Sequence, residues 1–285
     1  MKLSILYRGP LSSCNYGCEY CPFAKHTETK AEHDADGAAL ERFITWVETR
    51  GADQIGIFFT PWGEALIRRR YQEAFVRLSA LPQVTKVAIQ TNLSSRLDWV
   101  ERCDKTKVAL WATFHPLETT RERFLAQCEE LERRKVSYSV GVVGMKEHTE
   151  PLEWLRQRLP AHVYLWINAY KRRSDYYTPE EVQRFTSIDP LFPINTQYHP
   201  SADHACRTGH SVISVDGAGT IRRCHFIKTP LGNIYEEGFE KVLYERVCSN
   251  ATCGCHIGYV HMPELKLYEV FQEGVLERIP ARLDH

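Results

Sequence analysis

Three cysteines lie close together near the N-terminus, in the segment SSCNYGCEYCPFAK that begins at residue 12. Cys14, Cys18 and Cys21 occupy one short stretch, with Gly17 between them. Iron–sulfur clusters are bound by cysteine thiolates, usually four of them. Three thiolates can bind three irons of a cubane and leave the fourth iron open, and an open metal position is what a catalytic site requires. The spacing therefore predicts a catalytic iron–sulfur site.

Other uses of three neighbouring thiols require a further ligand or a different compartment. A zinc site needs a fourth Cys or His, and His26 follows Cys21 closely enough to serve. A ferredoxin-like electron carrier would have a fourth cysteine nearby. Purely structural thiols gain nothing by clustering where thiols stay reduced. The open iron site is the interpretation that needs three cysteines and no fourth.

The C-x3-C-x2-C spacing, with aromatic Tyr20 just before the last cysteine, resembles the signature of radical S-adenosylmethionine (AdoMet) enzymes. The resemblance implies that Cys14, Cys18 and Cys21 bind a [4Fe-4S] cluster whose open iron is chelated by AdoMet. It implies that one electron from the cluster cleaves AdoMet to a 5′-deoxyadenosyl radical, which abstracts a substrate hydrogen. An external one-electron donor such as flavodoxin or ferredoxin would supply that electron, and Tyr20 would contact the cofactor.

Three later segments resemble AdoMet-binding elements of the same superfamily. FTPWGEAL (59–66) resembles its Gly-Gly-Glu element with a tryptophan in place of the first glycine, QTNLS contains its Thr-Asn pair, and VVGMKE (142–147) partly matches an adenine-lining element. An acid in a first helical turn and an asparagine cap are the ordinary alternatives for two of these residues. The residues expected to bind AdoMet are Trp62, Gly63, Glu64, Thr91, Asn92, Val142 and Gly144.

Two further segments follow predicted strands and are expected to contact the substrate. His115 in FHP could act as an acid or base, and Lys171 in LWINAYKRR could hold an anion. A structural histidine and a solvated basic run are the alternatives. Cys103 and Cys128 fall on predicted helices and are expected to be packing residues.

Five more cysteines lie in the final third of the chain. The segment CRTGHSVISVDGAGTIRRCHF, followed by a Gly-Asn-Ile run at 232–234, resembles the start of the SPASM or shorter twitch extension of radical enzymes. The resemblance implies a second, auxiliary [4Fe-4S] cluster, with Cys248 as a spare thiol that could replace a ligand, as could His256. A four-thiolate zinc site is the alternative. The expected ligands are Cys206, Cys224, Cys253 and Cys255.

The elements that must position these residues alternate regularly. Short β-rich runs and longer helical patterns succeed one another, which predicts βαβ units and a parallel sheet. The strands are expected at 3–8, 54–59, 84–90, 108–114, 136–144 and 162–168. The helices between them are expected at 34–50, 67–81, 94–102, 118–134 and 151–158.

This alternation predicts the α/β class, as a partial (β/α)6 TIM-like barrel over residues 1–195. Residues 196–285 are expected to form a small iron–sulfur extension with a β-hairpin at 211–226 and a helix at 263–275. A doubly wound sheet is the alternative. In either fold functional residues gather at the C-terminal ends of the strands. Residues at or just beyond such ends are Cys14, Glu64, Asn92, His115 and Asn168.

Composition limits the function classes. The 285 residues carry 36 basic and 36 acidic side chains, whereas a nucleic-acid binder normally shows a basic excess. No apolar run approaches the roughly 18 residues of a membrane span, and the N-terminal apolar run is too short for a signal peptide. We expect a cytoplasmic protein, where ten cysteines indicate metal binding or catalysis more than disulfides.

The predicted function is a radical AdoMet oxidoreductase that oxidises a small polar molecule, such as a sugar or aminocyclitol, with help from the auxiliary cluster. The cysteine loop begins so early that we expect no N-terminal leader-binding domain, which makes a ribosomal peptide the alternative substrate. Radical epimerisation is another alternative, with Cys248 as the hydrogen donor. A non-catalytic zinc or iron–sulfur binding module is the rival from a different class.

Overall fold

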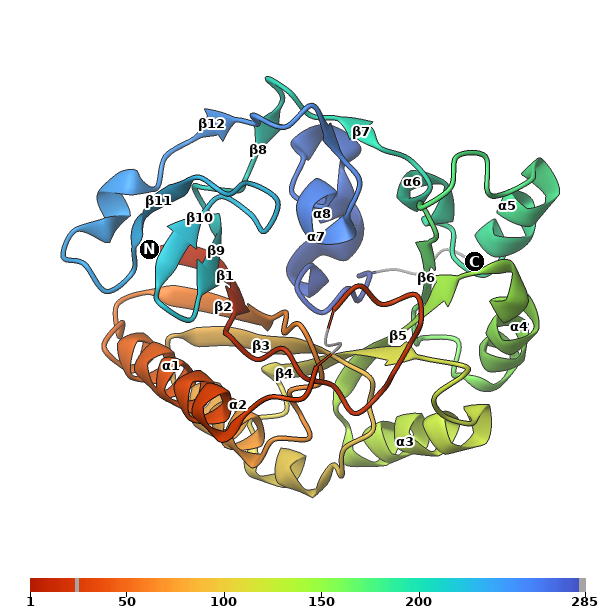
Figure 1. Ribbon diagram of the computed structural model, residues 1–285, viewed down its shortest axis with the longest axis horizontal. Helices are drawn as coiled ribbons and strands as arrows, with labels where there is room; N and C mark the ends of the chain where they lie inside the picture. Colours follow the sequence, from red (N-terminus) through yellow and green to blue (C-terminus); the bar gives the residue numbers. More distant parts are fainter. Residues whose placement is uncertain (24–25, 282–285) are drawn as a thin grey trace.

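A strongly curved sheet forms the frame of the computed structural model, which describes residues 1–23 and 26–281 (Figure 1). Its first six strands are parallel, and each pairs with the next along the chain. This confirms the predicted α/β fold, a partial TIM-like barrel. The strands are β1 (Lys2–Arg8), β2 (Gln54–Phe59), β3 (Val84–Thr91), β4 (Val108–Phe114), β5 (Ser137–Gly144) and β6 (Leu165–Ala169).

Helices cover the convex face of this sheet (Figure 1). The first begins at a capping box, in which Thr29 and Glu32 satisfy each other's backbone N–H groups. The same device, Thr178 with Glu181, begins a later helix. The helices are α1 (Lys30–Glu48), α2 (Arg69–Ala80), α3 (Arg121–Arg134), α4 (Thr149–Arg158), α5 (Pro179–Thr186) and α6 (Phe192–Asn195).

Alternate residues of each strand enter two separate cores. Ile57 and Phe59 of β2 pack in the larger core beneath the outer helices, whereas Phe58 packs in a second core on the concave face. The C-terminal segment fills that concave face, with α7 (His256–Tyr259) and α8 (Leu267–Phe271) lying inside the curve of the sheet (Figure 1). The sheet is thus buried on both faces, as continuous apolar strands require.

The C-terminal extension continues the sheet. β9 (Val212–Asp216) pairs in parallel with β1, and β10 (Thr220–Arg222) and β11 (Pro230–Asn233) follow it antiparallel, so the predicted hairpin at 211–226 is present. Within the described residues the sheet has nine strands. Two pairs of short strands complete the extension, namely β8 (Ala205–Cys206) with β12 (Arg246–Val247) and β7 (His199–Pro200) with β13 (Thr252–Cys253).

Two predicted helices are wrong in extent. The helix expected at 94–102 is a single 3-10 turn, Asp98–Arg102, because the carbonyl groups of Leu93 and Ser95 accept hydrogen bonds from the Gln127 side chain instead of from a helix. The helix expected at 263–275 is broken into three turns, since Lys266 and Gln272 have positive φ. The strand expected at 162–168 corresponds to β6, which starts at Leu165 rather than at 162.

Candidate functional site

The cysteine loop, residues 12–21, leaves the C-terminal end of β1 and is anchored by two buried acids. Asp36 of α1 accepts a hydrogen bond from the Leu11 amide at 3.1 Å, just before the loop. Glu28 accepts one from the Ser13 hydroxyl at 2.5 Å. Both carboxylates are almost fully buried. These two hydrogen bonds therefore fix the start of the cysteine loop in one position.

Gly63 lets the cysteine loop approach the end of β2 closely. A Cβ atom at this position would overlap with the carbonyl group of Ser13. The next residue, Glu64, donates its backbone N–H to the same Ser13 carbonyl at 3.1 Å. Only glycine permits such a contact between two backbone segments.

Glu64 is 2% exposed and links the ends of β2 and β3. Its carboxylate accepts hydrogen bonds from the Thr91 hydroxyl at 2.8 Å and the Asn92 amide at 2.5 Å. The Leu66 amide donates a third at 3.0 Å. Burial raises the pKa of Glu64 to about 7, although these three donors oppose the change. The residue thus fixes the Thr-Asn segment that the sequence predicts to touch AdoMet.

Asn92 connects this segment to the cysteine loop. Its side-chain amide donates to Asn15 Oδ1 at 3.0 Å and lies 3.9 Å from Cys14 Sγ. The Thr-Asn pair and the first cysteine are therefore neighbours, although 78 residues separate Asn92 from Cys14 in the sequence.

His115, at the end of β4, contacts the other side of the loop. Its Nδ1 lies 2.7 Å from the Tyr20 hydroxyl and 3.3 Å from Cys18 Sγ. Burial lowers the pKa of His115 to about 4, with a smaller contribution from His148. At neutral pH the ring is uncharged and can exchange a hydrogen bond with the tyrosine or the thiol.

These residues line one cavity of about 290 Å³ at the C-terminal ends of the strands. Gln90, Thr113 and Asn168 add polar groups, and Trp166 adds an aromatic wall. The structure thus brings together eleven of the residues that the sequence singles out. They are Cys14, Cys18, Tyr20, Cys21, Trp62, Gly63, Glu64, Thr91, Asn92, His115 and Asn168.

The two residues predicted on β5 lie elsewhere. Val142 is fully buried in the core beneath the outer helices, because successive strand residues point to opposite faces. Its neighbour Val143 lines the cavity instead. Gly144 packs against Ile167, and its carbonyl accepts a hydrogen bond from the Tyr177 hydroxyl at 2.5 Å.

Arg8, the last residue of β1, lies beside the first cavity, where it contacts Trp62, and was not singled out from the sequence. Its guanidinium lies 4.0 Å from the centre of the Trp62 ring, and its Nε donates to the Thr60 carbonyl at 2.7 Å. Among the residues that the structure describes, no acceptor pairs with its two terminal nitrogens. Its position directly before the cysteine loop, at a strand's C-terminal end, was a signal that could have identified it.

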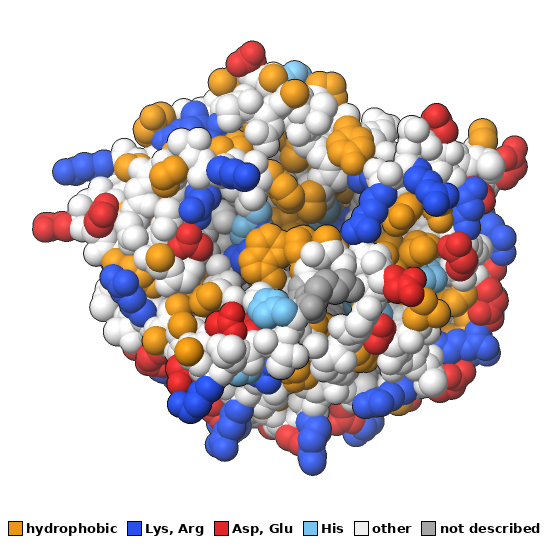
Figure 2. Space-filling model, viewed as in Figure 1, with side chains coloured by type: hydrophobic (Ala, Val, Ile, Leu, Met, Phe, Trp, Pro, Cys, Tyr) orange, Lys and Arg blue, Asp and Glu red, His pale blue; other side chains and the backbone are white. Residues whose placement is uncertain are grey.

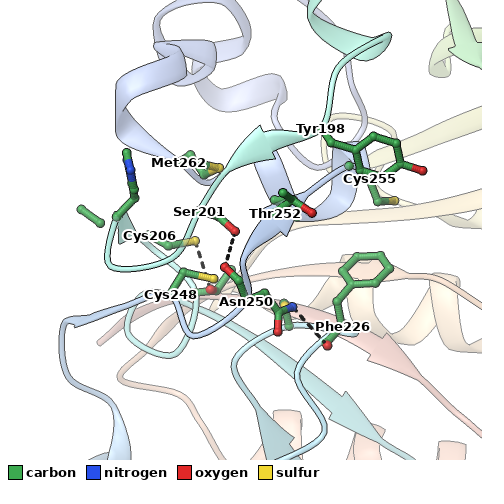
Figure 3. A pocket seen from close by; sticks show the side chains of 16 residues that line it. Tyr198, Ser201, Cys206, Phe226, Cys248, Asn250, Thr252, Cys255 and Met262 are labelled. Carbon is green, nitrogen blue, oxygen red and sulfur yellow. Dashed lines mark hydrogen bonds between the residues drawn. The ribbon is translucent and has the colours of Figure 1, made fainter. Parts of the chain in front are cut away.

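A second cavity of about 340 Å³ lies within the C-terminal extension (Figure 3). The small strand pairs and the start of α7 enclose it. All five cysteines of the final third line this cavity, namely Cys206, Cys224, Cys248, Cys253 and Cys255. His256, the predicted substitute ligand, instead packs at ring-to-ring distance from Trp111 in the concave core.

Lys171 holds the extension to the barrel. Its ammonium donates to the Asn195 carbonyl at 2.5 Å and to the Gly254 carbonyl between two of these cysteines. Burial lowers the pKa of Lys171, against the opposing effect of Cys255 and Cys253. Because its donors are used by the backbone and it lines neither cavity, its place differs from that of the predicted substrate contact.

The thiols of both cavities have the chemistry of iron–sulfur ligands. Burial raises the pKa of Cys18 to about 11, and that of Cys253 to about 12, so metal binding would release protons. Over residues 1–23 and 26–281, no three Cys, His, Asp or Glu side chains are arranged to hold a single metal ion. His26, the predicted alternative zinc ligand, contacts Ser12 at 3.1 Å.

The molecular face above the strand ends is hollowed near its middle, and hydrophobic side chains border the hollow (Figure 2). Exposed aromatic residues come from both regions. Phe23 follows the cysteine loop and is 44% exposed, while Tyr198 and Phe226 line the second cavity and are 58% and 47% exposed. Within the described residues, no helix is long and apolar enough to cross a membrane.

This fold is found among solved structures that hold AdoMet. The chain is similar to "Native anSMEcpe with bound AdoMet", with a TM-score of 0.55 and 14% identity over 85% of this chain and 83% of that one. It is also similar to anSMEcpe with bound AdoMet and the Cp18Cys peptide (TM-score 0.53, 15% identity, 85% and 82% covered). A third is SuiB of Streptococcus suis bound to its precursor peptide SuiA (0.56, 10%, 86% and 65%). No family model and no curated protein matches the sequence significantly.

Proposed function

We propose that this protein is a radical AdoMet enzyme. One observation carries the proposal: a loop with three cysteines lies at the C-terminal end of β1, in one cavity with the ends of β2, β3 and β4. The fold shared with AdoMet-bound proteins supports it. When bound, the cluster and AdoMet supply a 5′-deoxyadenosyl radical that abstracts a substrate hydrogen.

In this proposal Cys14, Cys18 and Cys21 hold three irons of the cluster, and AdoMet takes the open position. The backbone at Trp62 and Gly63, which line the cavity, would meet the cofactor, while the Glu64 side chain fixes the Thr91–Asn92 segment at the end of β3. Tyr20, Thr91, Asn92 and Val143 would contact it from the cavity wall.

His115 would orient Tyr20 and donate to Cys18, in place of the acid–base role expected from the sequence. A hydrogen bond to a ligand sulfur tunes the reduction potential of an iron–sulfur cluster. The ring stays neutral near pH 7 because its pKa is lowered to about 4. The residue thus acts on the cluster's ligand and not on the substrate.

We favour oxidation of a small polar molecule. A small redox protein would supply the electron that starts the reaction, and the auxiliary cluster in the second cavity would accept an electron from the substrate. Gln90, Thr113 and Asn168 give the cavity a polar wall, and the two terminal nitrogens of Arg8 offer N–H donors beside Trp62. Arg8→Leu should lower substrate turnover without changing substrate-free cleavage of AdoMet. Equal loss of both activities would refute this role of Arg8.

A peptide substrate is the second candidate. Two of the similar structures contain peptides, and exposed Phe23 and Phe226 line the first and the second cavity, respectively. We propose a cytoplasmic location, where the ten cysteines would stay reduced and able to bind iron. Turnover of peptides, but not of small polyols, would favour this candidate over the first.

The test is reductive cleavage of AdoMet. Anaerobically reconstituted protein should convert AdoMet to 5′-deoxyadenosine and methionine when dithionite is added, and an otherwise identical sample without reductant should not. Formation of S-adenosylhomocysteine alone, or zinc in place of iron after reconstitution, would refute the proposal.

A further inference from the structure

Five thiols line the second cavity, one more than a cubane cluster with four protein ligands can use. Sequence spacing selects Cys253 and Cys255 as a pair and leaves Cys248 spare. The geometry of the cavity is an independent criterion for choosing the four ligands, because the thiols that bind one cluster must lie in the same part of the cavity.

Cys206 and Cys248 are held side by side by the backbone. β8 ends at Cys206, which pairs with Arg246 in β12, only two residues before Cys248. The Cys248 amide then donates to the His204 carbonyl at 2.9 Å, and its own carbonyl accepts from the Asp203 amide at 2.9 Å. Figure 3 shows both side chains extending into the same part of the cavity. The backbone of Cys248 is thus held in place by hydrogen bonds beside Cys206.

Two other thiols join this pair. Cys224 lines the cavity beside Arg223, whose guanidinium donates to the carbonyl groups of Arg246 and Val247, just before Cys248. Cys253 lies at the far end of the same antiparallel pairing, opposite His199 in β7. A Cβ on Gly258 would lie 2.7 Å from Cys253 Sγ, so the missing side chain at 258 makes room for this sulfur.

Cys255 has different surroundings. It lies across the cavity beside Tyr198, apart from the Cys206 and Cys248 side chains (Figure 3). Cys255 follows the antiparallel pairing of residues 199–206 with 246–253 and directly precedes α7, whose Gly258 and Tyr259 amides donate to its carbonyl at 2.9 Å each. Because α7 packs on the concave face of the sheet, Cys255 lies on the side of the cavity toward the barrel.

We propose that Cys206, Cys224, Cys248 and Cys253 are the four ligands of the auxiliary cluster, and that Cys255 remains a free thiol on the side of the cavity toward the barrel. This assignment exchanges the roles that sequence spacing gives to Cys248 and Cys255. It rests on the proposed presence of an auxiliary cluster.

The experiment compares Cys248→Ser with Cys255→Ser, two matched substitutions, in a chain whose loop cysteines 14, 18 and 21 are all replaced by alanine. Only the auxiliary group then contributes iron. After anaerobic reconstitution the parent and the Cys255→Ser chain should hold about four irons each, and the Cys248→Ser chain fewer than about two. Circular dichroism verifies that all three chains are folded, and Cys248→Ala replaces the serine variant if it is not.

Loss of iron from the Cys255→Ser chain, with retention by the Cys248→Ser chain, would overturn the assignment, and so would equal behaviour of the two variants. If the parent takes up zinc and no iron, the proposed auxiliary cluster is refuted. The zinc content of the same two variants then tests the ligand set separately.

Thiol alkylation gives a second measurement in the full chain. In reconstituted protein, prolonged treatment with iodoacetamide should alkylate Cys255, whose sulfur displaces iodide and releases a proton, more extensively than the metal-bound thiols. Peptide mapping by mass spectrometry should recover Cys255 at least about tenfold more labelled than Cys248. The reverse ratio would contradict the assignment.

Discussion

The two cysteine-lined cavities differ in how the chain builds them. The first lies where parallel strands end, and its three thiols come from one loop whose stem is held by buried Asp36 and Glu28. The second is assembled from short strands and turns, and its five thiols come from segments spread over 50 residues. The first has fewer thiols than a cubane needs and the second has more. This difference suits one open and one fully ligated metal group.

Removing the three loop thiols is the strongest way to separate the two cavities. The triple variant with alanine at 14, 18 and 21 should lose AdoMet cleavage by more than about 1000-fold, because no open iron remains. It should still bind about four irons in the second cavity. Product analysis and iron content measure the two effects. Loss of all iron would show that the cavities do not bind metal independently.

The close backbone contact at Gly63 provides a subtler test of the first cavity. In Gly63→Ala the new methyl group would overlap with the Ser13 carbonyl, so the cysteine loop must move. AdoMet affinity should fall by more than about 100-fold. The matched control is Gly51→Ala, where a Cβ would meet nothing within 4 Å. Calorimetry would contradict the account if both variants bound AdoMet alike.

The buried carboxyl group of Glu64 predicts a pH effect on stability. Its pKa is raised from 4.5 to about 7 in the folded protein, so the folded state retains a proton that the unfolded chain loses. Stability should therefore decrease as pH rises from about 4.5 to about 7.

The comparison of wild type with Glu64→Gln isolates this contribution. In metal-free protein, urea denaturation measures the unfolding free energy of both chains. From pH 5 to pH 8 the wild type should lose about 2–3 kcal/mol of stability relative to Glu64→Gln. A pH-independent difference would show that Glu64 titrates normally.

The smallest predicted effect concerns the attachment of the C-terminal extension to the barrel. Lys171→Met removes hydrogen bonds to the Asn195 and Gly254 carbonyls and should cost about 1–2 kcal/mol. Exposed Arg173 is the neighbouring control, and Arg173→Met should change stability by less than about 0.5 kcal/mol. Hydrogen exchange should increase at 253–255 in the first variant alone. Unchanged exchange there would contradict this role of Lys171.

Much of the first cavity was predictable from sequence, and the reason is geometric. Parallel strands place their C-terminal ends together, so Cys14, Glu64, Asn92 and His115 could be grouped from strand ends alone. The same argument extends to Arg8, the last residue of the first strand. It could not predict that Val142 faces the outer helices, since a shift of one residue changes the face.

The second cavity was harder to predict because short strands carry little pattern. β8 and β12 have two residues each, and their pairing, which brings Cys206 beside Cys248, has no periodic signal in the sequence. Spacing alone favoured Cys255 over Cys248. The broken helix at 263–275 failed for a related reason, since Lys266 and Gln272 take positive φ without being glycine.

The contrast between an open and a closed metal group is tested most directly by electron paramagnetic resonance of the reduced, reconstituted protein during titration with AdoMet. The account predicts two cluster signals, of which AdoMet changes one and leaves the other unchanged. The signal that AdoMet changes should be absent from the variant with alanine at 14, 18 and 21. An AdoMet-sensitive signal that persists in that variant, or no sensitivity to AdoMet in the wild type, would contradict the account.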